Sequence, residues 1–342
     1  MTATTIDRDH DHDPGPDAAS ARVATLEQVA AVPIETAGSR VLVGTASWTD
    51  PTMTAAGVFY PKGADNAEER LAYYASSFPV VEVDATYYAL PAERTAQLWA
   101  ERTPPDFTFD IKAHALMTGQ GTETRRLPKA IREALPAQLQ EKTRIYAKDF
   151  PAELTDEVWR MFRSALAPLE ERGQLGSILL QYPKWVFPSN ENRASIEDAA
   201  ARLKGWRVAV EFRNGSWLND KNRDRTLAFL SERSIPFVMV DEPQGFKSSV
   251  PPEVAVTSPD LAIVRFHGRN AATWEAKNIT PAERFRYLYS RDELSEWMPR
   301  IREVTSQAKE VHLMFNNCYA NYGTTNAREI ADLLAGELAS PG

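Results

Sequence analysis

Eight short segments rich in β-branched and apolar residues recur along the 342-residue chain, and helical segments separate nearly all of them. The expected strands lie at residues 41–45, 80–88, 107–114, 177–183, 208–213, 237–243, 261–269 and 311–317. The expected helices lie at residues 67–78, 92–102, 156–172, 192–203, 224–232, 291–308 and 327–338. Strands that alternate with helices over more than about 250 residues predict a (β/α)8 TIM barrel. The alternative is an open doubly wound sheet, but no Gly-rich dinucleotide-binding motif follows any strand.

Ionic side chains recur at alternate positions of several expected strands. Glu211 and Arg213 share one face of the fifth strand. Glu82 and Asp84 share one face of the second, and Lys112 lies in the third. Alternate residues of a strand point to the same side, and buried charges are costly unless they are paired or functional. In a barrel one strand face looks inward and active sites lie at the C-terminal strand ends, so we expect these side chains to meet at that mouth.

Two segments are expected to lie outside the barrel wall, one at the N-terminus and one after the third strand. Residues 1–38 are rich in Asp, Ala and Pro and should form a disordered acidic tail, and residues 39–339 should form a single barrel domain. The tract of residues 9–13, Asp-His-Asp-His-Asp, resembles a metal-binding sequence but is more typical of a solvated charge run. Residues 115–150 form an unusually long connection after the third strand, which favours a lid over the site.

Composition excludes several classes of protein. The single Cys318 rules out a disulfide within the chain, which agrees with a cytoplasmic location. No apolar run approaches the roughly 20 residues of a membrane span, and no secretory signal is recognisable, so no membrane partner is expected. The net charge of −8 includes −5 in the tail and −3 in the rest. The barrel therefore lacks the broad basic surface of a protein that grips long nucleic acids, although a local basic cleft stays possible. The oligomeric state is left open.

Short motifs accompany these strands in a fixed order. They are Gly44-Thr45 with Ser47-Trp48, Phe59-Tyr60-Pro61, Val81-Glu82-Val83 with Thr86-Tyr87-Tyr88 and Leu90-Pro91, Lys112, Leu180-Gln181-Tyr182-Pro183, Glu211-Phe212-Arg213 with Ser216-Trp217, Arg265-Phe266-His267-Gly268-Arg269, and Phe315-Asn316-Asn317 with Asn326-Ala327. In these motifs residues 41–335 resemble the YecE-like proteins, bacterial and archaeal TIM barrels known as a domain of unknown function. One departure is Asp84, where the family more often has Asn. The resemblance implies the fold and the place of the site, and it implies no reaction.

Projection of the strand ends onto one rim gives the candidate site. The residues expected to act in catalysis are Glu82, Glu211 and His267. The residues expected to bind substrate are Trp48, Asp84, Tyr87, Lys112, Arg213, Trp217, Asp241, Arg265, Arg269, Asn316 and Asn317. Each has a plainer interpretation as well, because Arg213 could simply pair with Glu211, and Arg265 with Glu82, in a buried structural network.

The cations of this set favour an anionic or phosphorylated ligand, because arginine forks match phosphate geometry. TIM barrels often bind phosphate at the loops after strands seven and eight, here residues 267–270 and 317–326. The second loop leads into a helix, although Thr325 or Asn326 could be an ordinary N-cap there. Glu211 or Glu82 is the expected general base, and His267 the expected acid or phosphate partner.

A divalent metal on Glu82, Asp84, Glu211, Asp241 and His267 is an alternative, but no cofactor is expected because nearby arginines would repel the ion. Three functions are compatible with these residues. The favoured one is an enzyme, a hydrolase or an isomerase or lyase, that acts on a nucleotide, nucleic-acid end or sugar phosphate. The second is a glycosidase that uses Glu82 and Glu211 as its carboxylate pair. The third is a non-catalytic barrel that binds a ligand or a nucleic-acid end.

Overall fold

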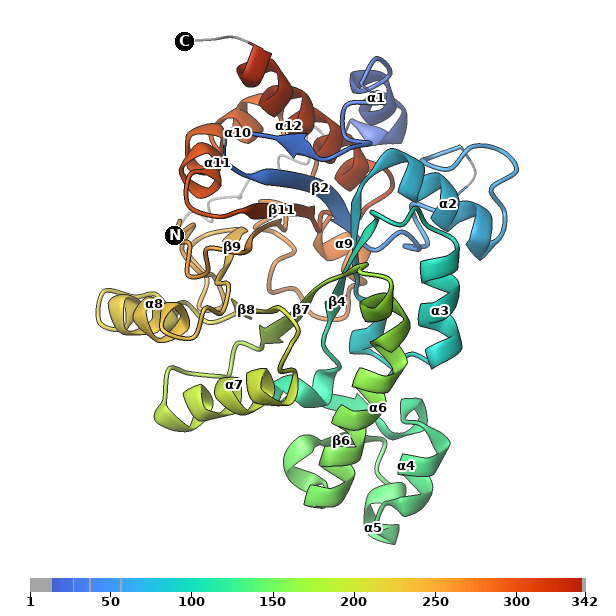
Figure 1. The fold of residues 1–342 in the computed structure, drawn as a ribbon, viewed down its shortest axis with the longest axis vertical. Coiled ribbons are helices and arrows are strands. Elements are labelled where there is room, and N and C mark those ends of the chain that lie inside the picture. Colours follow the sequence, from blue (N-terminus) through green and yellow to red (C-terminus); the bar gives the residue numbers. More distant parts are fainter. Residues whose placement is uncertain (1–13, 27, 37, 56, 340–342) are drawn as a thin grey trace, which may run out of the picture.

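Eight parallel strands form the wall of a TIM-like barrel in the computed structural model, which describes residues 14–26, 28–36, 38–55 and 57–339 (Figure 1). In their order around the wall the strands are β8 (Val208–Phe212), β7 (Leu175–Tyr182), β4 (Thr108–Lys112), β3 (Val80–Val83), β2 (Arg40–Ala46), β11 (Glu310–Phe315), β10 (Ala262–Phe266) and β9 (Val238–Asp241). The isolated bridge between Val210 and Phe237 joins β8 to β9 and nearly closes the barrel. The eight predicted strands are confirmed, and so is the predicted TIM-like barrel.

Helices surround this wall. They are α2 (Ala67–Ser77), α3 (Glu93–Glu101), α6 (Ala152–Glu171), α7 (Asn190–Arg202), α8 (Arg223–Ser231), α9 (Pro281–Arg284), α10 (Arg291–Ser295), α11 (Met298–Thr305) and α12 (Tyr322–Ala339), with 3-10 turns η1 (Ala85–Tyr87) and η5 (Gly215–Trp217). The expected helix 291–308 is divided into α10 and α11 near Pro299, which has no backbone N–H to continue the first helix. In the described part of the chain no helix is both long and apolar enough to cross a membrane.

The N-terminal segment differs from the disordered tail that composition predicts. Residues 15–22 form helix α1 (Gly15–Arg22), and strand β1 (Ile34–Glu35) pairs antiparallel with β2. Arg22 donates to both carboxylate oxygens of Glu329 in α12 at 2.8 Å and to the carbonyl oxygen of Tyr289. Small apolar residues of the segment, such as Ala19, are buried. The Asp-His tract of residues 9–13 lies outside the described residues.

The connection of residues 115–150 is a small folded unit. It contains η2 (Ala115–Thr118), β5 (Gly121–Glu123), η3 (Thr124–Arg126), α4 (Lys129–Ala134), α5 (Ala137–Gln140), β6 (Arg144–Tyr146) and η4 (Ala147–Asp149). Strands β5 and β6 pair antiparallel, and Ile131, Leu135 and Ile145 are buried in the unit beside α6 (Figure 1). The unit begins at the C-terminal end of β4, and its role as a lid stays a prediction.

The parallel register determines which side chains enter the barrel. Glu82 lies beside Asp110, and Gln181 beside Glu211, so each pair shares a face of the sheet. Arg265 contacts both Glu82 and Glu211, which identifies that face as the interior. Gly44 in β2 is also required here, because a Cβ atom at this position would collide with the carbonyl oxygen of Val80.

A second ionic cluster lies deeper in the barrel, toward the N-terminal strand ends. His312 Nδ1 is 2.7 Å from Asp110 Oδ2, and His312 Nε2 is 3.0 Å from Glu310 Oε1. Ser177 and Arg207 complete the cluster through bonds to Asp110 and Glu310, each of 2.7 Å. Burial lowers the pKa of His312, but the two carboxylates outweigh burial and raise the pKa from 6.5 to about 9. His312 is therefore a buried cation.

We expect His312 to make the stability of the protein depend on pH. A folded-state pKa above the unfolded value means that the contribution, about 3 kcal/mol, is fully present below pH 6.5 and is lost as the pH rises through about 9. Urea unfolding of the wild type and of His312→Gln at pH 6, 8 and 10 measures this effect. The difference between the two proteins should shrink at the highest pH. A difference that stays constant across the three pH values would contradict the assignment.

Candidate active site

Arg265 lies at the centre of the barrel mouth and binds two carboxylates from other strands. Its Nε and Nη2 donate to Glu82 Oε2 and Oε1 at 2.8 and 2.7 Å, and its Nη1 donates to Glu211 Oε2. The three side chains come from β10, β3 and β8, and each residue is at most 1% exposed. Charges buried to this degree persist only when they are paired and hydrogen-bonded. The structural network suggested by the sequence for Arg265 and Glu82 is confirmed.

Glu211 is surrounded by donors on its other oxygen as well. Gln181 Nε2 donates to Glu211 Oε1 at 2.9 Å, Arg213 Nη1 donates at 3.2 Å, and His267 Nε2 lies 3.2 Å away. Burial raises the pKa of Glu211, but Arg265 and the other donors around the carboxylate together outweigh burial and hold the pKa well below 4.5. Glu211 is therefore an ionised carboxylate whose oxygens are already occupied. This position does not suit the general base that the sequence predicts.

His267 is buried beside Glu211 and does not suit the role of a catalytic acid. Its side chain has no exposed surface, and burial lowers its pKa from 6.5 to about 3. Asn316 Nδ2 lies 2.9 Å from His267 Nδ1, and Trp274 and Phe285 pack near the imidazole. A catalytic acid must be protonated at the working pH, whereas this imidazole is neutral near pH 7. His267 and Asn316 are brought to the mouth as predicted, as neutral polar groups.

Asp241 and Arg269 lie outside the mouth, contrary to prediction. Arg269 Nε and Nη2 donate to the two Asp241 oxygens at 3.0 and 2.8 Å. Tyr289 Oη and Trp297 Nε1 each donate to Asp241 at 2.7 Å, and Arg269 also reaches Glu296 at 3.0 Å. These contacts fix the end of β9 to the start of α11 on the outer side of the wall. Asp241 and Arg269 have structural partners and are not free to bind a substrate.

Glu242 occupies the inward position next to Asp241, and sequence analysis missed it. Glu242 is 3% exposed, lies 3.1 Å from Arg213 Nη1 and accepts a hydrogen bond from the Val250 backbone N–H at 2.7 Å. Burial raises its pKa from 4.5 to about 7, against the charge of Arg213. Alternation places Asp241, the last residue of β9, and Glu242, which follows it, on opposite sides of the wall, so the inward one is found only when the register to β10 is known.

Lys112 and Asp84 are the mouth residues that keep free charges. Lys112 Nζ lies 4.9 Å from the centre of the Tyr87 ring, and Tyr87 Oη donates to Gln120 Oε1 at 2.7 Å. Burial, together with Arg265, lowers the pKa of Lys112, and burial raises the pKa of Asp84. Among the described residues neither the Lys112 ammonium nor the Asp84 carboxylate has a side-chain hydrogen bond or an ion pair. Both side chains are partly exposed, so a ligand can reach them.

The two tryptophans expected as walls of the site lie in the core. Trp217 has no exposed surface, stacks on Phe212 with ring centres 4.2 Å apart and donates through Nε1 to the Val186 carbonyl oxygen. Trp48 is 7% exposed and meets Trp99 edge to face. The bulk of these rings is used for packing, so neither presents a surface on which a substrate could stack.

Asn317 and the start of α12 are also structural. Asn317 Nδ2 donates to the Tyr287 carbonyl oxygen at 2.9 Å and to Asn326 Oδ1 at 2.8 Å. Helix α12 begins at Tyr322, so Thr325 and Asn326 lie within its first turns and do not form a loop before it. The preceding residue, Asn321, donates to Pro16 and Ser20 of the N-terminal segment, which covers this helix end. The expected phosphate site at residues 317–326 is therefore occupied by the protein itself.

No metal site is evident in the part of the chain that the structure describes. None of its groups of three or more His, Cys, Asp or Glu side chains could hold a metal ion. Of the residues considered as ligands, Glu82 and Glu211 bind Arg265, and Asp241 lies outside the wall. The residues present do not favour a metal at the mouth.

Comparison with known proteins identifies the family of the chain. The family described as "Protein of unknown function DUF72" matches residues 42–341. The chain belongs to this family. The UPF0759 protein YunF of Bacillus subtilis (strain 168) is a relative with 28% identity over 298 residues, which cover 86% of this chain and 94% of YunF. No reaction accompanies the family description.

Crystal structures of two DUF72 family proteins have the same fold. The protein from Thermotoga maritima MSB8 has 30% identity and a TM-score of 0.67, with 86% of this chain and 99% of that chain covered. The protein from Enterococcus faecalis V583 has 27% identity and a TM-score of 0.67, with 86% and 95% covered. The similarity extends over the whole barrel in both cases.

The mouth of this DUF72 barrel thus combines a rigid ionic base with two free charges above it. Arg265 forms the base together with Glu82 and Glu211, both of which it binds. Lys112 and Asp84 are too far apart to form an ion pair, although each lowers the electrostatic cost of the other.

Proposed function

We propose that the barrel mouth is the active site of an enzyme that acts on a small phosphate-bearing substrate by proton transfer. In this proposal Lys112 binds the anionic group, and Asp84 donates or accepts the proton. The main support is the Lys112 ammonium, which has no carboxylate partner among the described residues while Arg213, Arg265 and Arg269 all have one. We also propose that the chain is a YecE-like protein, on the motifs quoted above. This resemblance does not indicate a reaction.

The choice of Lys112 as the anion-binding group follows from the state of the arginines. Arg265 uses Nε and both Nη atoms on Glu82 and Glu211, so it has no free fork. Arg213 shares its Nη1 between Glu211 and Glu242 and lies against the Trp274 ring. A lysine binds phosphate as a point charge and needs no planar fork. A bound phosphate would also relieve the unfavourable field that Arg265 exerts on Lys112.

Asp84 is the acid–base group that the proposal requires. Burial raises its pKa, so this carboxyl group holds a proton more readily than an ordinary aspartate does, which suits a group that donates or accepts a proton. Glu82 and Glu211 would then not react themselves. Because the Arg265 guanidinium binds both, they would hold the base of the site in place beneath Lys112 and Asp84. Both Glu82 oxygens accept hydrogen bonds from Arg265, which leaves neither of them free to hand a proton to a leaving group, as the acid of a glycosidase pair must do.

A binding screen followed by a turnover assay tests the function. Isothermal titration with phosphorylated sugars, nucleotides and short 5′-phosphorylated oligonucleotides should identify compounds that bind. The same compounds without the phosphate group should bind more weakly or not at all. Proton and phosphorus NMR of the best ligand with the protein in D2O should then show exchange of a carbon-bound proton or a product. Binding without exchange or product over hours would indicate a non-catalytic barrel. Absence of binding to every phosphorylated compound would remove the basis of the proposal.

Asp84→Asn is expected to separate catalysis from binding. The amide cannot transfer the proton, so turnover of the ligand found in the screen should fall by about 100-fold or more, while the dissociation constant should change by less than about threefold. A raised folded-state pKa means that the Asp84 carboxyl destabilises the fold as the pH rises through that pKa. The variant should therefore melt at or above the wild-type temperature at pH 8. Equal losses of binding and turnover would contradict the assigned role.

A further inference from the structure

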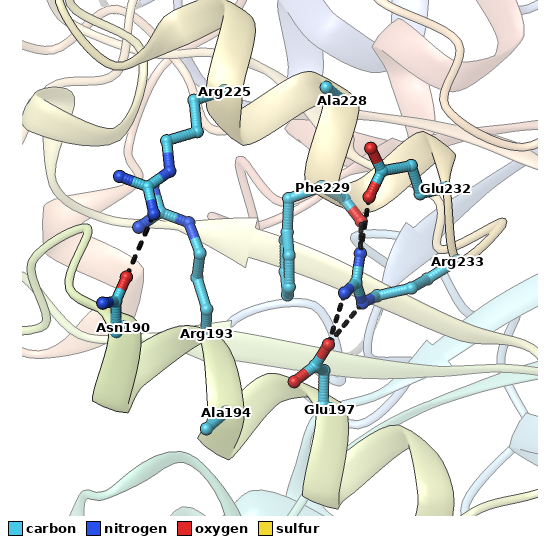
Figure 2. Close-up of a pocket in the computed structure, with 9 residues that line it drawn as sticks. All are labelled: Asn190, Arg193, Ala194, Glu197, Arg225, Ala228, Phe229, Glu232 and Arg233. Carbon is cyan, nitrogen blue, oxygen red and sulfur yellow. Dashed lines mark hydrogen bonds and ion pairs between the residues drawn. The ribbon is translucent and has the colours of Figure 1, made fainter.

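A cavity of about 390 Å³ lies between helices α7 and α8 on the outer ring of the barrel (Figure 2). Arg193 and Arg225 line one end of it, and Arg233 lines the other. The Phe229 ring lies between these two ends. The cavity is separate from the barrel mouth, because its lining belongs to two outer helices and the turn after α8.

The arginine at the base of this cavity lacks the partners that its burial requires. Arg193 is 7% exposed, yet its Nε and Nη2 have no hydrogen-bond partner in the described structure. Its Nη1 donates to the Pro188 carbonyl oxygen at 3.3 Å, and its guanidinium lies 5.4 Å from the centre of the Trp217 ring. Burial of guanidinium N–H groups without acceptors is costly, so an anion in the cavity that drew this guanidinium toward itself would remove that cost.

Arg225 places a second positive charge against the first. Figure 2 shows the two guanidinium groups directed toward one another, and the Arg225 Nη2 donates only to Asn190 Oδ1 at 3.0 Å within the described residues. Burial lowers the pKa of Arg193, and the charge of Arg225 lowers it further. The carboxylates that line the cavity do not relieve this repulsion, because Glu197 and Glu232 bind Arg233 at the opposite end.

We propose that this cavity binds an organic phosphate, with the phosphate group between Arg193 and Arg225 and the organic group against Phe229. Two guanidinium forks and the Asn190 amide supply the donors that a phosphate dianion accepts. Asn190 is the first residue of the 13-residue helix α7, so the helix dipole also favours an anion there. Phe229, Ala194 and Ala228 supply the apolar surface for the rest of the ligand.

Titration with phenyl phosphate and with inorganic phosphate tests this site directly. Full-length protein carrying Lys112→Met is used, so that binding at the mouth does not contribute. Isothermal titration at low ionic strength should show that phenyl phosphate binds more tightly than inorganic phosphate, and that phenol does not bind. Arg193→Met and Arg225→Met should each weaken phenyl phosphate binding at least tenfold. Phe229→Leu should weaken phenyl phosphate binding and leave inorganic phosphate binding unchanged.

Arg233→Met is the matched control, because Arg233 lines the same cavity but already has two glutamate partners. Its affinity for phenyl phosphate should stay within about threefold of the parent. The exposed Arg225→Met variant should also melt, without ligand, at or above the parent temperature, since it removes a like-charge contact. Failure of phenyl phosphate to bind would overturn the proposal. The proposal would also be overturned if phenyl phosphate and inorganic phosphate bound with equal affinity. An affinity loss in Arg233→Met as large as in Arg193→Met and Arg225→Met would overturn it as well.

Discussion

Arg265→Met is expected to lower the free energy of unfolding by about 3–5 kcal/mol, the largest stability effect of any substitution considered. The variant leaves two carboxylates, Glu82 and Glu211, buried without their shared cation. A protein of this kind has a net stability of about 5–15 kcal/mol, so the loss is a large fraction of the total. Urea unfolding followed by circular dichroism at pH 7 measures it.

Arg160→Met is the matched control for this substitution. Arg160 also makes two hydrogen bonds to one glutamate, Glu157, each of 2.6 Å, but it does so on the exposed surface of α6. Its replacement should cost less than about 1 kcal/mol, because exposed ion pairs contribute little. A combined variant, Glu82→Gln with Glu211→Gln and Arg265→Met, should recover part of the lost stability. Similar costs for Arg265→Met and Arg160→Met would show that burial does not determine the energy of the pair.

Lys112→Met is expected to reduce affinity for the phosphorylated ligand at the mouth by about 10- to 100-fold, with a matching loss of kcat/KM. The loss corresponds to one charge-assisted hydrogen bond of about 1.5–3 kcal/mol. Stability should be unchanged or higher. The sign follows from the lowered pKa of Lys112, because a lysine disfavoured as a cation in the fold destabilises it at pH values below that pKa. Isothermal titration and thermal melting at pH 7 measure the two effects.

Lys148→Met provides the comparison for Lys112. Lys148 also lies over a tyrosine ring, 6.0 Å from the centre of Tyr146, but it is exposed on the 115–150 unit. Its replacement should change neither binding nor melting temperature measurably. A large fall in the melting temperature of Lys112→Met with unchanged ligand affinity would show that Lys112 is a structural cation. The proposed function would then lose its main support.

The barrel could be predicted from sequence because two periodicities repeat along the chain. Short apolar runs alternate with helical segments, and several of the runs carry ionic residues at alternate positions. This argument placed Glu82, Glu211 and Arg265 in one interior, where the structure has them. The ordered structure of residues 14–26 and 28–36 could not be predicted in this way, because small apolar residues such as Ala19 indicate burial only when the surface they pack against is known.

The charge state of the site could not be predicted from residue types alone. Counting cations suggested free arginines, whereas Arg213, Arg265 and Arg269 each bind carboxylates that come from other strands or helices. Long-range pairs of this kind depend on register, as does the choice between Asp241 and Glu242 on β9. Burial, which lowers the pKa of His267 to about 3, is likewise a property of the folded chain.

The junction of β8 and β9 determines where the barrel wall should open locally. There the described wall is joined through the Val210–Phe237 bridge, with Val210 N–H donating to the Pro236 carbonyl oxygen at 2.9 Å, and not through a ladder of several residues. Local opening costs least where the fewest backbone bonds must break together. Amide protons along the junction of β8 and β9 should therefore exchange with solvent quickly, through local opening. Those of β2 and β11 should exchange slowly, because their exchange requires cooperative unfolding.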